Sequence, residues 1–330
     1  MTSTDPKTSP DSSRRGPELV CEDFGEALEL LLGAGFRVDL IYPAEDPKVA
    51  LLSIEGRPLG LRTGDAPALP GSMPPFEAQF SLTRAGSSAA IGRAGMVYRD
   101  LVPGRLGGRY VGSHITILDG GPVADWVHYH RIAVQMIYVR KGWVRLVYEG
   151  QGEPFVMNTG DFVLQPPEIR HRVLASSPGL EVIEITAPAL HETFADHELA
   201  LPGEGRGDGE YFGQRFHHHR AADARWTPYR GGEAQETGMK AASRGLMDAR
   251  VVRGAGASGI VLDAHDGELV FGFVIEGSAR LEFGDGFDFG PGDAFVIPPE
   301  QGWALSAIGE NFRLLQVATA RLDAAPQCPL

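Results

Sequence analysis

The stretch HYHRIAVQMIYVRKGWVRLVYEGQGEPFVMNTGDFVLQPPEIRH, residues 128–171, contains the pattern that decides the fold. Its short apolar runs, such as QMIYV and WVRLVYEG, are separated by Gly, Pro or Asp, which is typical of β-strands joined by tight turns. His128 and His130 are two residues apart, so on a strand both side chains point to the same face. The stretch therefore predicts a β-structure that carries paired histidines on one face.

The same strand rhythm extends outward from this stretch. It covers about residues 95 to 190 and resumes at about residue 249. Each region contains an apolar strand that begins at a glycine, followed by a Gly-Asp turn and a proline: GWVRLVYEG and GDFVLQPP (160–167), then GSARLEFG and GDAFVIPP (292–299). The 43 glycines and 24 prolines of the 330-residue chain suit many short strands joined by tight turns. The sequence therefore predicts an all-β fold built on an internal repeat.

The first copy of the repeat resembles the cupin (RmlC-like) superfamily, whose first motif is G-x5-H-x-H-x(3,4)-E-x6-G. His128, His130 and Gly142 match this motif, and Gln135 stands where glutamate is usual. The leading glycine, Gly121, is displaced by one position. The departure at Gln135 replaces a carboxylate by a neutral amide.

The family's second motif, G-x5-P-x4-H-x3-N, matches at Gly160, Pro166 and His171, with Ala175 in place of the final asparagine. Because the motif regions repeat, the chain resembles a bicupin. The resemblance implies two tandem cupin (jelly-roll) β-barrels, and the sequence adds a small α+β N-terminal extension.

The resemblance also implies a metal site at His128, His130, Gln135 and His171. Converging imidazoles suit Fe, Mn, Ni, Zn or Cu. We expect one divalent transition metal ion per chain, with Fe(II) preferred and Mn, Ni or Zn as alternatives. A neutral Gln135 leaves the charge of the ion uncancelled, which favours a small anionic, chelating substrate. In the alternative interpretation Gln135 turns away and three imidazoles form the site alone.

The second copy of the repeat lacks this ligand set. Counting from its glycines, the positions of the two histidines hold Asp263 and His265, the acid position holds Val270, and the last position holds Trp303. We therefore expect the second barrel to be degenerate and to bind no metal.

The sequence predicts five segments. They are a disordered tail at 1–18, a helix plus β extension at 19–70, the metal-binding barrel at 71–190, a linker at 191–235, and the degenerate barrel at 236–330. The linker contains three consecutive histidines, His217, His218 and His219, which we expect to be solvated because adjacent residues cannot all face one ion in regular structure.

Five further residues are candidates for the chemistry of the first barrel. His114 lies on a predicted strand one element before the ligands and is a candidate general acid or base. Arg109 and Tyr110 could orient an anionic substrate, and Glu168 and Arg170 lie in the turn before His171, near the expected barrel mouth. For each of them a structural or surface role is the alternative.

Charge and patterning exclude several classes of protein. The net charge of −13 repels phosphate backbones, so we expect no nucleic-acid partner. No apolar stretch approaches the length of a membrane span, and the N-terminus lacks the apolar core of a secretory signal. Cys21 and Cys328 are the two cysteines and form no disulfide framework. We expect a cytoplasmic protein and a homodimer.

Three functions fit these observations. The first is an Fe(II)-dependent dioxygenase that cleaves a ring or a C–C bond, as the resemblance to two-barrel cupins implies. The second is a non-redox lyase, isomerase or cyclase in which the metal acts as a Lewis acid. The third is a sensor module that binds a small molecule, although no output domain is evident in the sequence.

Overall fold

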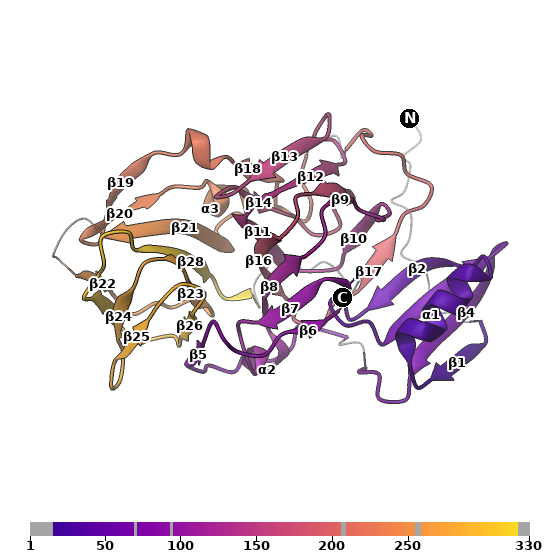
Figure 1. Ribbon diagram of the computed structural model, residues 1–330, viewed down its shortest axis with the longest axis horizontal. Coiled ribbons are helices and arrows are strands. Elements are labelled where there is room, and N and C mark those ends of the chain that lie inside the picture. The colour runs from indigo at the N-terminus through magenta and orange to yellow at the C-terminus, as the bar shows by residue number, and fades with distance from the viewer. Residues whose placement is uncertain (1–15, 69–70, 93–94, 206–208, 255–258, 323–330) are drawn as a thin grey trace.

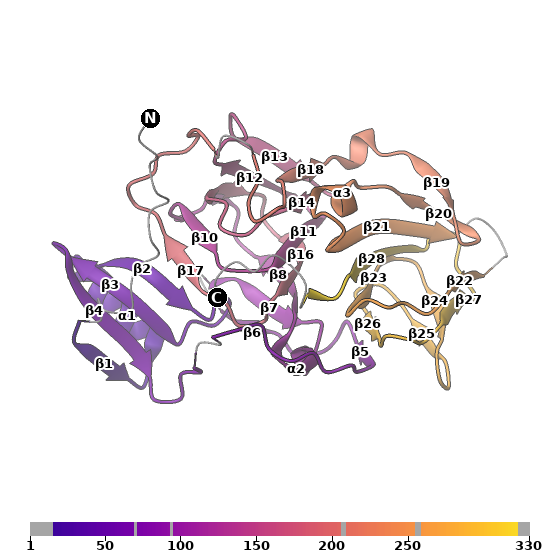
Figure 2. The same ribbon diagram turned by 180° about the vertical axis from the view of Figure 1, so that it is seen from behind.

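The computed structural model describes residues 16–68, 71–92, 95–205, 209–254 and 259–322. Most of the predicted tail at 1–18 lies outside these residues. Figure 1 shows three units in a row: the N-terminal extension, the first barrel and the second barrel, and Figure 2 shows the same order from behind. The two barrels and the few short helices confirm the predicted all-β, two-barrel fold.

The N-terminal extension is a helix packed on a small sheet. The sheet has the strands β1 (Glu18–Cys21), β2 (Arg37–Tyr42), β3 (Val49–Ile54) and β4 (Arg57–Thr63). Helix α1 (Phe24–Gly33) begins after Asp23, whose carboxylate accepts a hydrogen bond from the Glu26 amide at 2.9 Å. The helix buries Phe24 and packs Leu28 and Leu31 against the sheet.

The first barrel is formed by two sheets. Their strands are β6 (Ala90–Ile91), β7 (Val97–Asp100), β8 (Val111–Ile117), β9 (Gly121–Pro122), β10 (His128–His130), β11 (Val134–Lys141), β12 (Trp143–Tyr148), β13 (Phe155–Asn158), β14 (Phe162–Leu164), β15 (His171–Ser176), β16 (Leu180–Ala187), β17 (Thr193–Ala195) and β18 (His217–His219). One sheet has the order β1-β4-β3-β2-β17-β10-β15-β12-β13, with β9 on β15. The other has the order β18-β14-β11-β16-β8-β7-β6. The extension therefore continues the sheet that carries His128 and His130.

The second barrel has two sheets in the order β19-β20-β21-β28-β23-β26-β5 and β22-β27-β24-β25. Strand β5 (Ser81–Thr83) precedes the first barrel in the chain but pairs with β26. The others are β19 (Trp226–Tyr229), β20 (Gly232–Gln235), β21 (Met247–Gly254), β22 (Ile260–Leu262), β23 (Val270–Glu276), β24 (Ala279–Glu282), β25 (Phe287–Phe289), β26 (Ala294–Ile297), β27 (Trp303–Ser306) and β28 (Arg313–Thr319). Short helices α2 (Arg105–Gly108) and α3 (Met239–Ala242) and a 3-10 turn at Ala221–Asp223 connect the strands.

The segment predicted as a linker at 191–235 contains strands that belong to the barrels. Strand β17 pairs with β10 and β2, β18 pairs with β14, and β19 and β20 join the second barrel. These strands are three or four residues long, too short to show an apolar rhythm in the sequence. The predicted boundary at 71 differs as well, because β5 crosses to the second barrel.

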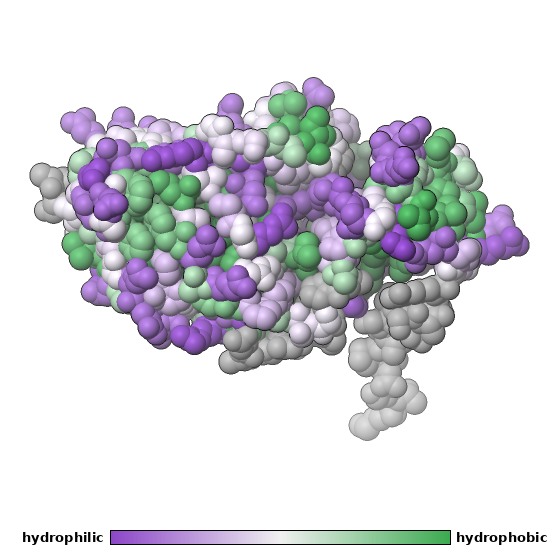
Figure 3. Space-filling view, turned by 90° about the horizontal axis from the view of Figure 1, so that it is seen from below, coloured by the Kyte–Doolittle hydropathy of each residue, from purple (hydrophilic) through white to green (hydrophobic). Residues whose placement is uncertain are grey.

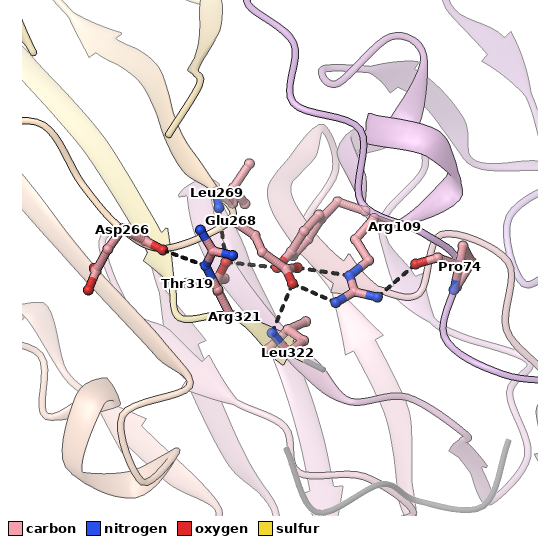
Figure 4. A network of polar contacts seen from close by, with 9 residues as sticks. Pro74, Arg109, Asp266, Glu268, Leu269, Thr319, Arg321 and Leu322 are labelled. Carbon is pink, nitrogen blue, oxygen red and sulfur yellow. Dashed lines mark hydrogen bonds and ion pairs between the residues drawn. The ribbon is translucent and has the colours of Figure 1, made fainter. Parts of the chain in front are cut away.

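A buried ion pair joins the two barrels (Figure 4). Arg109 donates to both carboxylate oxygens of Glu268, at 2.8 Å from Nε and 2.5 Å from a terminal nitrogen, and the two side chains are 1% and 3% exposed. The same carboxylate accepts from the Tyr110 hydroxyl at 2.9 Å and the Leu322 amide at 3.0 Å. Burial, followed by the charge of Glu268, raises the pKa of Tyr110 well above its usual value. Arg109 and Tyr110 are thus interface residues.

Candidate metal centre

Strands β10 and β15 bring three histidines together. His128 and His130 alternate along β10, and His171, the first residue of β15, is directly opposite His128 in the antiparallel register. One ligand atom of each imidazole lies within 4.8 Å of the others, and the side chains are buried. Within the described residues these three form the one group of histidine, cysteine or acidic side chains with such geometry.

The partners of the Nδ1 atoms orient the three rings. His128 Nδ1 lies 2.8 Å from the Trp126 carbonyl oxygen, and His171 Nδ1 lies 3.0 Å from the Ile169 carbonyl oxygen. Because a carbonyl can only accept, these rings carry their proton on Nδ1 and present the Nε2 lone pair to an ion. His130 Nδ1 lies 2.9 Å from the Thr193 hydroxyl, which can donate or accept, and this contact orients the third ring. This donor set fits a divalent transition metal ion.

Gln135 belongs to a buried chain of polar groups beside the histidines. Its Oε1 accepts from Gln165 Nε2 at 2.6 Å, and its Nε2 donates to Glu184 Oε1 at 2.9 Å. Gln165 in turn accepts from the Tyr148 hydroxyl at 2.8 Å. The amide oxygen that would bind an ion therefore already receives one hydrogen bond and keeps its second lone pair. The role of Gln135 as a ligand stays a prediction.

The histidines open onto a cavity of about 870 Å³. Apolar side chains of the barrel strands line its middle, among them Ile115, Ile137, Leu146 and Val182. Residues of the N-terminal extension line its other side: the beginning of α1, Val38 and Ile41 of β2, and the loop 44–48. The extension therefore forms a wall of the cavity.

His191 also lines the cavity, and the sequence analysis missed it. Its Nδ1 lies 3.1 Å from the Pro188 carbonyl oxygen, so its Nε2 is an acceptor, and this atom has no hydrogen-bond partner among the residues that the structure describes. The ring centroid is 5.4 Å from that of His130. Burial lowers the pKa of His191 to about 4, so the imidazole is neutral near pH 7. No motif marks this residue; the signal was its place just after the apolar run LEVIEITAP.

His114 lies outside the cavity. Its neighbours on β8, Ile115 and Ile117, line the cavity, so the strand alternation turns His114 to the outer face. There its Nε2 lies 2.9 Å from Glu181 Oε2, and its ring packs edge-on against Phe273 of the second barrel, with the ring centroids 5.9 Å apart. Burial and the Arg99 guanidinium lower its pKa. The structure gives His114 a place in the barrel interface.

Glu168 and Arg170 lie in the turn before His171, as expected, but the described residues that line the cavity include neither. The guanidinium carbon of Arg170 lies over the Tyr129 ring, 4.0 Å from its centroid, and Arg170 Nε lies 3.3 Å from Asp196 Oδ2. Arg109 and Tyr110, in the barrel interface, are likewise not among these lining residues. The structure thus brings together the three predicted histidines and places Gln135 in the lining of the same cavity, whereas none of the four predicted substrate contacts lines it.

The His217–His219 run and the second barrel contribute no ligand cluster within the described residues. His217, His218 and His219 form β18, where His217 Nε2 lies 2.6 Å from the Thr237 carbonyl oxygen and His218 stacks on Phe155 at 4.7 Å. In the second barrel, Val270 and Trp303 are buried in the core. Asp263 pairs with Arg230 at the surface, and His265 Nε2 lies 3.0 Å from the Ile297 carbonyl oxygen.

Comparison with known proteins agrees with this geometry. The family model described as "Cupin domain" matches residues 114–185. No curated protein sequence matches the chain. No helix in the described ranges is long and apolar enough to cross a membrane.

Two solved structures are similar in fold at 14% sequence identity. Protein Ylba from E. coli, of the family model DUF861, has a TM-score of 0.52 over 74% of this chain and 92% of that chain. The oxalate decarboxylase of Lactobacillus farciminis, solved as a formate complex, has a TM-score of 0.51 over 78% of this chain and 88% of that chain. Residues 114–185 thus match the cupin domain, and the chain as a whole has a fold similar to that of these solved structures.

Proposed function

We propose that the chain is a metal-dependent enzyme that holds one divalent transition metal ion at His128, His130 and His171. The observation that carries the proposal is the common orientation of the three rings, whose Nδ1 atoms are engaged by two carbonyl oxygens and one hydroxyl. Fe(II) is the metal we propose first, with Mn, Ni and Zn as alternatives. Gln135 Oε1 is proposed as a fourth ligand through its remaining lone pair.

The reaction we propose is the Fe(II)-dependent dioxygenation of a ring or C–C bond in a small, chelating organic substrate that binds as an anion. When bound, the ion would supply Lewis-acid and electron-transfer chemistry to substrate and dioxygen. Among the residues of the chain, His191 Nε2 accepts a hydrogen bond from a substrate hydroxyl, and the apolar walls around Ile137 and Leu146 exclude water. Three neutral imidazoles and an amide leave the charge of the ion to attract the anionic oxygen.

A non-redox lyase, isomerase or cyclase is the second candidate. One observation favours it: Glu184 lines the cavity and holds the Gln135 amide, so a carboxylate lies within the site. A carboxylate in this position can take a proton from a substrate carbon or hydroxyl. The sensor interpretation is the third candidate and predicts that the ligand is released unchanged.

Metal loading and oxygen uptake test the proposal. The metal-free protein is loaded with Fe(II), Mn(II), Ni(II) or Zn(II), and elemental analysis should find about one ion per chain. Oxygen consumption with chelating enols and phenols then distinguishes the dioxygenase, and product formation without oxygen uptake indicates the lyase or isomerase. Failure to hold any of the four ions would contradict the proposal. The homodimer and the cytoplasmic location are proposed as well, and light scattering on the purified protein tests the first.

A further inference from the structure

The lining of the cavity changes from polar to apolar along the barrel strands. On strand β16, Thr186 is opposite Gln135, Glu184 is opposite Ile137, and Val182 is opposite Val139. On its other side, Val182 is opposite Ile115 and Leu180 is opposite Ile117. The polar groups therefore lie at one end of the strand, and apolar side chains line the cavity from Ile137 to Leu180.

Strand β12 and its partner β15 repeat this order. Tyr148 is opposite His171, Leu146 is opposite Val173, and Val144 is opposite Ser176. Moving away from His171 along β15, the cavity wall is therefore built by Val173, Leu146 and Val144. The four residue steps between Glu184 and Leu180 correspond to about 13 Å of strand. The apolar section of the cavity is thus of roughly that length.

The cavity opens at the end farthest from Gln135. The lining residues there are exposed, with Ile91 at 78% and Leu32 at 44%, whereas His128, His171 and His191 are each less than 5% exposed. Ile91 belongs to β6, which pairs with β7, and β7 lies beside Ile115 on β8. Figure 3 shows apolar atoms on the surface of the N-terminal extension, at the right of that view. Apolar side chains of the extension therefore lie at the entrance.

The charges of the lining argue against a small polyanion. Lys48 is the one lysine or arginine among the described lining residues, and its ammonium group lies 3.3 Å from Asp46. Acidic side chains surround the entrance, including Glu22, Asp23 and Glu29. A second anionic group on a substrate would therefore meet carboxylates and no free basic partner in this part of the cavity.

We propose that the substrate is amphipathic, with one oxygen-bearing head at the histidines and an apolar body that follows Ile137, Leu146 and Val182 toward the entrance. The head carries a hydroxyl that His191 Nε2 accepts, and helix α1 covers the far part of the body through Leu28 and Phe24. This inference rests on the proposed function for the head, while the apolar body is argued from the cavity alone.

Two series of probes separate these two parts. The first is acetohydroxamate, hexanohydroxamate, octanohydroxamate and decanohydroxamate, titrated calorimetrically into the Zn(II)-loaded protein. The second is the n-alkanols from ethanol to decanol, titrated into the metal-free protein. In both series affinity should rise about three- to fourfold per methylene until the apolar section is filled, then level off.

The outcomes of the two series differ for the two proposals. Affinity that is independent of chain length in both series overturns the amphipathic substrate, even where Zn(II) and hydroxamates bind. Rising affinity for alkanols in a protein that, on loading, takes up none of Fe(II), Mn(II), Ni(II) or Zn(II) supports the apolar body and overturns the metal-dependent function.

Variants locate the body in the cavity. Ile115→Phe fills the apolar section, so the gain in affinity should end at a shorter chain. Leu28→Ser should weaken binding of the longest probes. Leu30→Ser is the matched control, because Leu30 lies on the same helix, is 69% exposed and is not a described lining residue. Equal effects of Leu28→Ser and Leu30→Ser, or no effect of either, would overturn the role of the extension.

Discussion

Replacement of Glu268 by leucine tests how the two barrels are held together. The substitution leaves the Arg109 guanidinium, 1% exposed, without its carboxylate, and removes the acceptor of the Tyr110 hydroxyl and the Leu322 amide. Breaking a buried, hydrogen-bonded ion pair on one side costs about 3–5 kcal/mol of unfolding free energy. With a urea dependence of about 3 kcal/mol/M, the midpoint of unfolding should fall by roughly 1–1.7 M.

The assay is urea unfolding of the metal-free protein followed by circular dichroism. The double variant Arg109→Met with Glu268→Leu should cost much less than the sum of the single variants, because no buried charge remains without a partner. Asp263→Leu is the control, since Asp263 pairs with Arg230 at 2.7 Å but both side chains are more than half exposed. Its cost should be about 1 kcal/mol or less. A Glu268→Leu midpoint equal to that of the control, or additive single costs, would refute the reasoning.

Four further predictions concern the metal barrel. His128→Ala and His171→Ala should each abolish metal retention, measured by elemental analysis, with an unchanged circular dichroism spectrum, because the core holds the barrel without the ion. Gln135→Glu should bind metal more tightly and turn over substrate more slowly, and Gln135→Ala should bind metal slightly less well. Equal metal affinity in the wild type and both variants would mean that Gln135 does not contact the ion. His191→Phe should retain the metal but bind hydroxyl-bearing probes about tenfold less tightly, because one hydrogen bond of about 1.5 kcal/mol is lost. An unchanged affinity in calorimetry would contradict the role of His191 as a hydrogen-bond acceptor. Burial and Arg99 lower the pKa of His114, so the unfolded state takes up a proton before the folded state as the pH falls below about 6.5. The free energy of unfolding should therefore decrease as the pH falls through that window. His114→Gln should make the free energy of unfolding less dependent on pH there.

The sequence predicted the parts of the fold that local patterns control. The i, i+2 spacing of His128 and His130 and the Gly-Asp turn before His171 depend on strand alternation and turn chemistry alone, and these residues meet in the structure. Counting from the glycines of the second repeat placed Trp303 at the last ligand position, and the structure places Trp303 in the core of that barrel. That this barrel binds no metal stays a prediction.

Features that depend on distant partners could not be predicted in this way. The role of Arg109 is set by Glu268, which lies 159 positions away in the sequence. The place of His114 depends on which face of its strand points into the cavity, and residue type does not reveal this. His191 follows the last long strand of the first barrel without a motif, and its importance comes from the wall that the extension and barrel build together.

The continuity of the sheet through β2, β17 and β10 has a consequence for where the chain can be cut. Strand β10 is held between β15 and β17, and β17 is held in turn by β2. A shortened chain that begins after Thr63 would leave β17 as a bare edge, open to pairing with strands of other molecules. It would also open the histidine pocket to water along the length of the missing wall. Residues 16–63 therefore share a sheet with the barrel they precede, and we expect a boundary drawn between them to divide a single folding unit.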